Sequence, residues 1–140
     1  MKRYTQEELE GKFVIAYDTI CDGNQCLMGG EEGDADYAPL LFDSEDEALR
    51  KIFDDNLSML ISHLEDGMLQ KFNDGVTREM IEDMENVFET SDVAQMRKFM
   101  EEYPECNDSG EWVEPAETFI VNRKAIFTTK GIVIEGKKLH

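Results

Sequence analysis

Few side chains in this 140-residue chain have the types and spacing that catalysis needs. The chain has two histidines, and His140 is its last residue, so His63 is the one internal imidazole. His63 lies beside an apolar helical stripe, and we interpret it as a flanking or buried neutral side chain. The sequence contains no Gly-x-x-x-x-Gly-Lys phosphate loop, no Gly-x-Ser-x-Gly elbow and no His-Glu-x-x-His pair. We therefore predict no catalytic residues.

The three cysteines are candidates for zinc binding or nucleophilic chemistry. Cys21 and Cys26 flank a predicted turn and could supply two ligands, but a structural zinc site needs four. Cys106 lies among carboxylates such as Glu105 and Asp108, which raise the pKa of a thiol and disfavour the reactive thiolate. We expect reduced structural thiols, with no disulfide and no zinc.

The carboxylates between residues 31 and 45 resemble a calcium loop in part. Asp34 and Asp36 occupy the first and third positions of an EF-hand loop, and Glu45 occupies the twelfth. The sixth position, where that loop requires glycine, is Pro39. The motif therefore fails, and we predict no metal and no cofactor.

The charge of the chain carries more information than any one of these residues. It has 32 acidic and 14 basic side chains, a net charge of −18. Residues 31–47 contain eight acids and no base, residues 101–117 contain seven acids and no base, and residues 117–140 are net +3. Such a surface repels nucleic acid phosphates and anionic membranes and attracts basic partners. We expect neither direct nucleic acid binding nor membrane binding.

A predicted helix at residues 77–89 carries acids along one side. Glu79 and Glu89 are ten residues apart, which is about 15 Å of helix, and five acids over that length give one charge per about 3.8 Å. Phosphates along one nucleic acid strand are about 3.4 Å apart. We therefore predict a non-catalytic acidic interaction protein that binds a basic protein surface, with mimicry of nucleic acid as one form of that binding. The predicted contact residues are Glu31, Glu32, Asp34, Asp36, Glu79, Glu82, Asp83, Glu85, Glu101, Glu102, Glu105 and Trp112.

Two other functions stay open. The first is a small-ligand or cation-binding module that uses the Gly29-Gly30 loop and the nearby carboxylates. The second is a small enzyme that uses His63 or a carboxylate. A pocket lined by converging polar groups would favour either of them over a flat or convex acidic face.

The elements that position these residues begin with strand signals. Residues 12–18 are rich in β-branched and aromatic side chains, the Asp22-Gly23 pair predicts a turn, and residues 25–28 can return as a second strand. Residues 38–42 are extended and apolar, with Pro39 at a sheet edge or in a packed coil. The sequence therefore predicts an N-terminal hairpin followed by one further extended segment.

Helical signals fill the middle of the chain. Ser44 followed by Glu47 is a capping box that starts a long amphipathic helix ending near Asp66-Gly67. A second helix covers about 77–89, and a third carries Val93 to Tyr103 until Pro104. These last two could also form one bent helix.

The end of the chain is polar up to Glu117 and then strand-like. Residues 118–121, 125–129 and 132–135 are apolar or alternating and are separated by short loops, which predicts a three-stranded meander. The expected fold is α+β, with an antiparallel sheet built from the hairpin and the meander and two or three central helices packed on one face.

The size and the hydropathy pattern predict one domain over residues 1–140. The sequence has neither a signal-peptide pattern nor a stretch of about 20 apolar residues, so we expect a soluble cytoplasmic protein. The overall pattern is common in small bacterial and phage accessory proteins and identifies no family.

Overall fold

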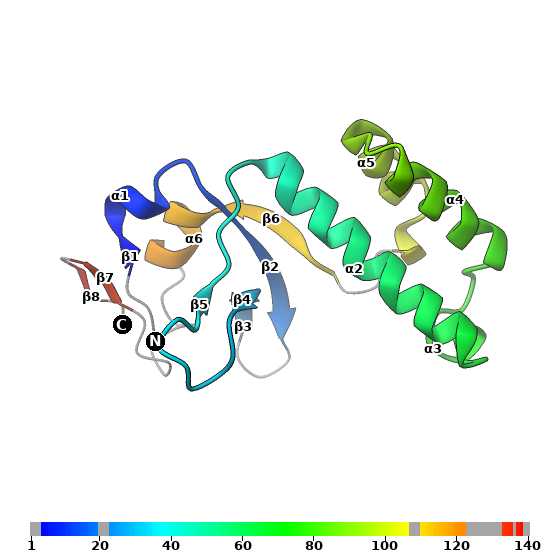
Figure 1. Ribbon diagram of the computed structural model, residues 1–140, viewed down its shortest axis with the longest axis horizontal. Helices are drawn as coiled ribbons and strands as arrows, with labels where there is room; N and C mark the ends of the chain where they lie inside the picture. Colours follow the sequence, from blue (N-terminus) through cyan, green and yellow to red (C-terminus); the bar gives the residue numbers. More distant parts are fainter. Residues whose placement is uncertain (1–3, 20–22, 107–109, 123–132, 136, 139–140) are drawn as a thin grey trace. The chain divides into compact units, whose positions relative to one another are not determined.

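The computed structural model describes residues 4–19, 23–106, 110–122, 133–135 and 137–138. The chain forms two compact units (Figure 1). One comprises Met1–Ala48 and Glu111–His140, and we call it the β unit; the other comprises Leu49–Gly110, and we call it the helical unit. Compactness alone does not tell whether two units unfold together, so the single domain stays a prediction.

The main sheet of the β unit has the order β3-β2-β6. Strand β2 (Phe13–Thr19) lies between β3 (Gly23–Cys26) and β6 (Trp112–Pro115), and both neighbours are antiparallel to it (Figure 1). The predicted N-terminal hairpin is therefore confirmed. Strand β6 falls in the segment for which the sequence predicted a polar connection, and that prediction is wrong.

The described part of the β unit also contains two smaller sheets. Strand β4 (Met28–Gly29) pairs antiparallel with β5 (Ala38–Pro39). Strand β7 (Val133–Glu135) pairs parallel with β1 (Tyr4–Thr5) and antiparallel with β8 (Lys137–Lys138). Helix α1 (Gln6–Leu9) begins directly after β1. The α+β class and the strand predicted near the C-terminus are confirmed.

One predicted strand of the meander is a helix. Residues 118–121 lie within α6 (Ala116–Asn122). Ala116, Phe119 and Ile120 are fully buried, a three-and-four spacing that the helix directs to one side. A short apolar run fits a strand and a buried helix equally well, and only its packing decides between them. The predicted strand at 125–129 lies outside the described residues.

The core of the β unit is shared between β2 and the helix α6. Val14, Ile15 and Ala16 are all fully buried, and since successive side chains of a strand point to opposite faces, both faces of β2 are covered. The buried cluster of this unit comprises Tyr4, Leu9, Val14, Ala16, Cys26, Ala38, Ala116, Phe119 and Ile120.

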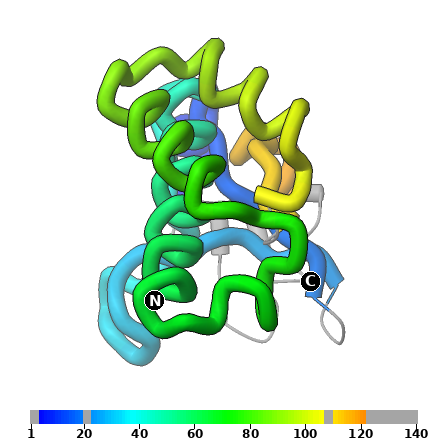
Figure 2. The backbone as a smooth tube through the Cα atoms, turned by 90° about the vertical axis from the view of Figure 1, so that its right-hand side faces the viewer, coloured from blue at the N-terminus to red at the C-terminus, as the bar shows by residue number. Residues whose placement is uncertain are grey.

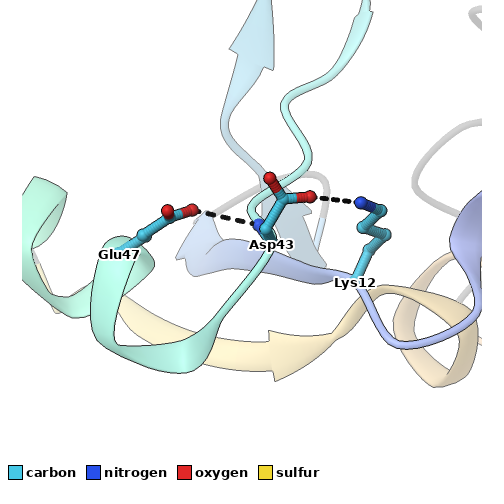
Figure 3. Close-up of polar contacts among 3 residues, drawn as sticks. All are labelled: Lys12, Asp43 and Glu47. Atoms are coloured by element: carbon cyan, nitrogen blue, oxygen red, sulfur yellow. Dashed lines mark hydrogen bonds and ion pairs between the residues drawn. The ribbon is translucent and has the colours of Figure 1, made fainter.

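The long helix α2 (Glu45–Glu65) begins at the predicted capping box. The Glu47 backbone N–H donates to Ser44 Oγ at 3.2 Å, and the Glu47 carboxylate accepts from the Asp43 backbone N–H at 3.2 Å. Asp43 also forms an ion pair with Lys12, from the residue before β2 (Figure 3). The side chain of Glu47 thus reaches one residue further back than in the usual capping box.

Three further helices follow α2 in the helical unit, and the tube in Figure 2 traces them from green to yellow. They are α3 (Leu69–Phe72), α4 (Arg78–Glu89) and α5 (Val93–Glu102), and a 3₁₀ turn at Pro104–Cys106 follows. The predicted helix positions are confirmed. Among the described residues, no helix has the length and apolarity needed to cross a membrane.

A left-handed residue separates α4 from α5. Ser91 has a φ of 54°, a left-handed conformation that interrupts a right-handed α-helix. The Asp92 side chain then caps α5 by accepting from the Gln95 N–H at 3.2 Å. Arg50 of α2 lies over the Phe88 ring at 4.9 Å and donates to Ser91 Oγ at 3.2 Å. The alternative of one bent helix is therefore excluded.

The core of the helical unit is aromatic and methionine-rich. The Phe53 and Phe99 rings meet edge to face, with centroids 6.1 Å apart and planes at 84°. The buried cluster comprises Phe53, Leu57, Leu60, Leu69, Val76, Ile81, Met84, Met96, Phe99 and Cys106.

Candidate acidic interface

The acidic side of α4 carries four of the predicted contact residues on one helix. All of its acids are exposed: Glu79, Glu82, Asp83, Glu85 and Glu89. On the other side of the helix, Ile81 and Met84 are fully buried and hold its rotation. The Thr77 hydroxyl fixes the start of the helix by accepting from the Met80 N–H at 3.2 Å. The spacing of the carboxylates is therefore set by a packed helix.

These carboxylates are exposed, and within the described residues no basic side chain pairs with them. In the described part of the chain, none of the five acids of α4 lies within 4.0 Å of a basic side chain. Elsewhere the structure does pair acids, as in Lys51–Asp55 at 2.8 Å and Lys98–Glu102 at 4.0 Å. The acidic side of α4 is thus available to cations from outside.

Several acids stand where a helix disfavours them. Glu89 lies in the last turn of α4, and Glu101 and Glu102 lie in the last turn of α5; neither turn contains a basic residue. The carbonyl end of a helix carries partial negative charge and stabilises cations instead. The ion pair with Lys98 offsets part of this cost for Glu102. Glu89 and Glu101 have no basic side chain within 4.0 Å in the described part of the chain, so they reduce the stability of their helices.

A second acidic group continues from α5, which packs beside α4 (Figure 1). Glu101 and Glu102 are exposed, and Glu105 in the following 3₁₀ turn is half-buried. The structure thus places the predicted contact residues of α4 and of 101–105 in the same unit. Glu89 belongs to the acidic side of α4 and was not among the predicted contact residues, although its position seven residues after Glu82 could have identified it.

The acidic loop at residues 31–36 belongs to the β unit instead. Glu31, Glu32, Asp34 and Asp36 are all exposed. The loop folds as consecutive turns, in which the Asp34 N–H donates to the Glu31 carbonyl at 3.0 Å and the Tyr37 N–H to the Asp34 carbonyl at 3.2 Å. The predicted contact residues are therefore divided between two units.

The Gly29-Gly30 pair, which the ligand-binding alternative required, is explained by the chain's own packing. Gly30 has a φ of 79°, and a Cβ there would lie 3.4 Å from the Asp36 carbonyl oxygen. A Cβ on Gly29 would lie 3.2 Å from Leu40 Cδ1. Gly30 thus adopts a left-handed conformation that favours glycine, and Gly29 lies where its chain approaches the Leu40 side chain closely.

Trp112 is part of the β unit rather than of the helical acidic group. Its ring is half-buried against the core of that unit, and its indole N–H donates to Glu114 Oε1 at 2.9 Å. The burial of the ring and this hydrogen bond give Trp112 a structural role in β6.

His63 is half-buried and bonded, as a flanking histidine should be. Its Nδ1 lies 2.5 Å from Asn73 Oδ1, and because an amide oxygen only accepts, Nδ1 donates. Asn73 is only 4% exposed, and the His63 ring packs on Phe72 with centroids 5.1 Å apart. The contact ties the last turn of α2 to the residue after α3.

The two described thiols are buried in separate cores. Burial and, to a smaller extent, the Glu105 carboxylate raise the pKa of the Cys106 thiol to about 11. Burial also raises the pKa of Cys26. Neither is a ready thiolate nucleophile. Cys21 lies outside the described residues, and among those described no group of three histidine, cysteine or acidic side chains could hold a metal ion.

No family model, curated protein or solved structure matches this chain.

Proposed function

We propose that this chain is a non-catalytic interaction protein whose helical unit binds a basic surface of another protein. The observation that carries the proposal is the acidic side of α4, where five exposed carboxylates have no basic partner among the described residues. Charge of one sign on a rigid element raises the association rate with a partner of opposite charge. A protein of this charge would not itself bind phosphates.

The position of the acids supports binding over solubility alone. Acids that serve only solubility can lie anywhere on the surface, and the first turn of a helix stabilises them. Glu89 and Glu101 lie in last turns and have no basic partner among the described residues, so they lower stability there. Sequences tend to retain such costs at functional sites.

The partner we propose is a protein surface that otherwise binds nucleic acid. The acids of α4 follow one another at about the spacing of phosphates along a strand. Arginine and lysine side chains placed to contact consecutive phosphates could therefore contact consecutive carboxylates. A cytoplasmic location, where thiols such as Cys26 and Cys106 stay reduced, is part of the proposal.

The test is capture of partners from a lysate of the source cells at low salt, with the intact chain as bait. The comparison bait carries Glu79→Gln, Glu82→Gln, Asp83→Asn and Glu85→Gln. All four side chains are exposed, so the fold should be kept. A control bait carries Glu10→Gln, Glu65→Gln, Asp66→Asn and Asp74→Asn, which removes the same charge at other exposed positions.

The expected result is a protein that the intact chain and the control bait retain, that the α4 bait loses, and that duplex DNA displaces. Equal loss from both altered baits would mean that total charge alone holds the protein. Captured proteins that resist both the substitutions and salt, or nucleic acid retained by the chain itself, would refute the proposal.

A further inference from the structure

We propose that residues 49–110 form a module that unfolds independently of the rest of the chain and carries the partner surface by itself. The second half of this inference rests on the proposed function; the first half does not. Three observations lead to it: the course of the chain, the closed core of the helical unit and the distribution of its acids.

The chain of the helical unit is inserted between the two segments of the β unit. The β unit is made of two separate segments, and these pair with each other directly in β2 and β6, with Val14 opposite Glu114 and Ile15 opposite Val113. The Ala116 N–H continues this pairing by donating to the Lys12 carbonyl at 2.8 Å. The helical unit is one uninterrupted segment between them. Domains are commonly accepted as inserts at such points.

The helical unit closes its own core. Its buried cluster draws on every helix of the unit, from Phe53 in α2 to Cys106 in the 3₁₀ turn. Polar contacts then link the helices at both ends of α2, through Arg50 with Ser91 and through His63 with Asn73. A unit of this length buries about 60% of the surface of its unfolded chain, and many domains of that size fold alone with modest stability.

The charge of the helical unit suffices for the proposed binding. It has fifteen acidic and six basic residues, a net charge of −9. It also contains the acids of both α4 and α5, whereas the loop at residues 31–36 belongs to the β unit. The inference is therefore that this loop is a solvated turn outside the partner surface.

Independent unfolding is tested in the full chain by native-state hydrogen exchange with two matched substitutions. Ile81→Val removes one methylene from the helical core, and Ile120→Val removes one from the β-unit core; both isoleucines are fully buried. Such a deletion destabilises the unit that contains it. Hydrogen exchange that occurs through opening of that unit should then be about 2- to 10-fold faster. We expect Ile81→Val to act on α2, α4 and α5 alone, and Ile120→Val to act on β2 and β6 alone. Acceleration of both units by either substitution would overturn the inference and confirm one domain.

Confinement of the partner surface is tested with a ten-residue arginine peptide as the probe at low salt. The bait with four neutralised acids on α4 is compared with one that carries Glu31→Gln, Glu32→Gln, Asp34→Asn and Asp36→Asn, which removes the same charge from the loop. We expect the α4 substitutions to weaken peptide binding about tenfold and the loop substitutions less than about twofold. Equal weakening would overturn the confinement. The lysate capture would still decide the proposed function separately.

Discussion

The strongest local test of this fold is Ser91, the residue that separates α4 from α5. Its φ of 54° is a left-handed conformation that costs a residue with a Cβ about 1 kcal/mol or more. Ser91→Gly should therefore gain about 1 kcal/mol in backbone energy. It also loses the hydrogen bond from Arg50 at 3.2 Å, which is exposed and contributes about 0.5 kcal/mol.

Ser91→Ala separates these two effects because it loses the same hydrogen bond and keeps the Cβ. We expect the glycine variant to be more stable than the alanine variant by about 1 kcal/mol, and more stable than the parent by a smaller amount. Urea unfolding followed by far-ultraviolet circular dichroism measures these differences in the free energy of unfolding. The comparison requires that the slope of this free energy against urea concentration is the same for all variants.

Thr90→Gly is the matched control one residue earlier. Thr90 has helical angles of φ −73° and ψ −13°, and its hydroxyl donates to the Val87 carbonyl at 2.8 Å. Glycine there loses this hydrogen bond and a few tenths of a kcal/mol of helix propensity, so it should lower the stability by about 1 kcal/mol. The same replacement should thus have opposite signs at adjacent positions. An alanine variant at 91 as stable as the glycine variant would refute the left-handed conformation of Ser91 and favour a continuous bent helix.

Further outcomes follow from charge, burial and capping. The melting temperature should rise between about 10 and 500 mM NaCl because salt screens the repulsion among the acids; a flat or falling midpoint would mean that pairing or bound cations already neutralise them. Thiol titration of the denatured protein should count three cysteines and metal analysis should find no zinc, whereas in the native protein Cys26 and Cys106 should resist labelling at pH 8. The raised pKa of Cys106 means that the unfolded thiol ionises first as pH increases. The parent should therefore lose about 1.4 kcal/mol of stability per pH unit from about pH 9 to about 11, relative to Cys106→Ala, and identical pH profiles would refute the burial of the thiol. Ser44→Ala should lower the stability by about 1 kcal/mol through loss of the cap on α2, while Ser58→Ala at an exposed position within α2 should not lower it.

The candidate interface was predictable in part. The two sides of α4 follow from its own residues, since a helix with apolar side chains in one sector must expose the acids in the other. The sequence did not show which contact residues lie in the same unit, because the loop at 31–36, the α4 acids and Trp112 are far apart along the chain. Their assignment to units depends on which segments share a core.

The sequence by itself thus determined those elements whose ends are set by interactions between neighbouring residues. The Ser44 cap starts α2 by a hydrogen bond three residues along, and β2 and β3 pair from Thr19 opposite Gly23, only four residues apart in the sequence. Tertiary structure decided the elements that need a distant partner. Strand β6 is only four residues long and ends in Glu114 and Pro115, which strands disfavour, and it pairs along an edge of β2 that lies about a hundred residues earlier in the sequence. The apolar run at 118–121 became helical because a three-and-four spacing buries Phe119 and Ile120 in the same core, and a strand would point them to opposite faces.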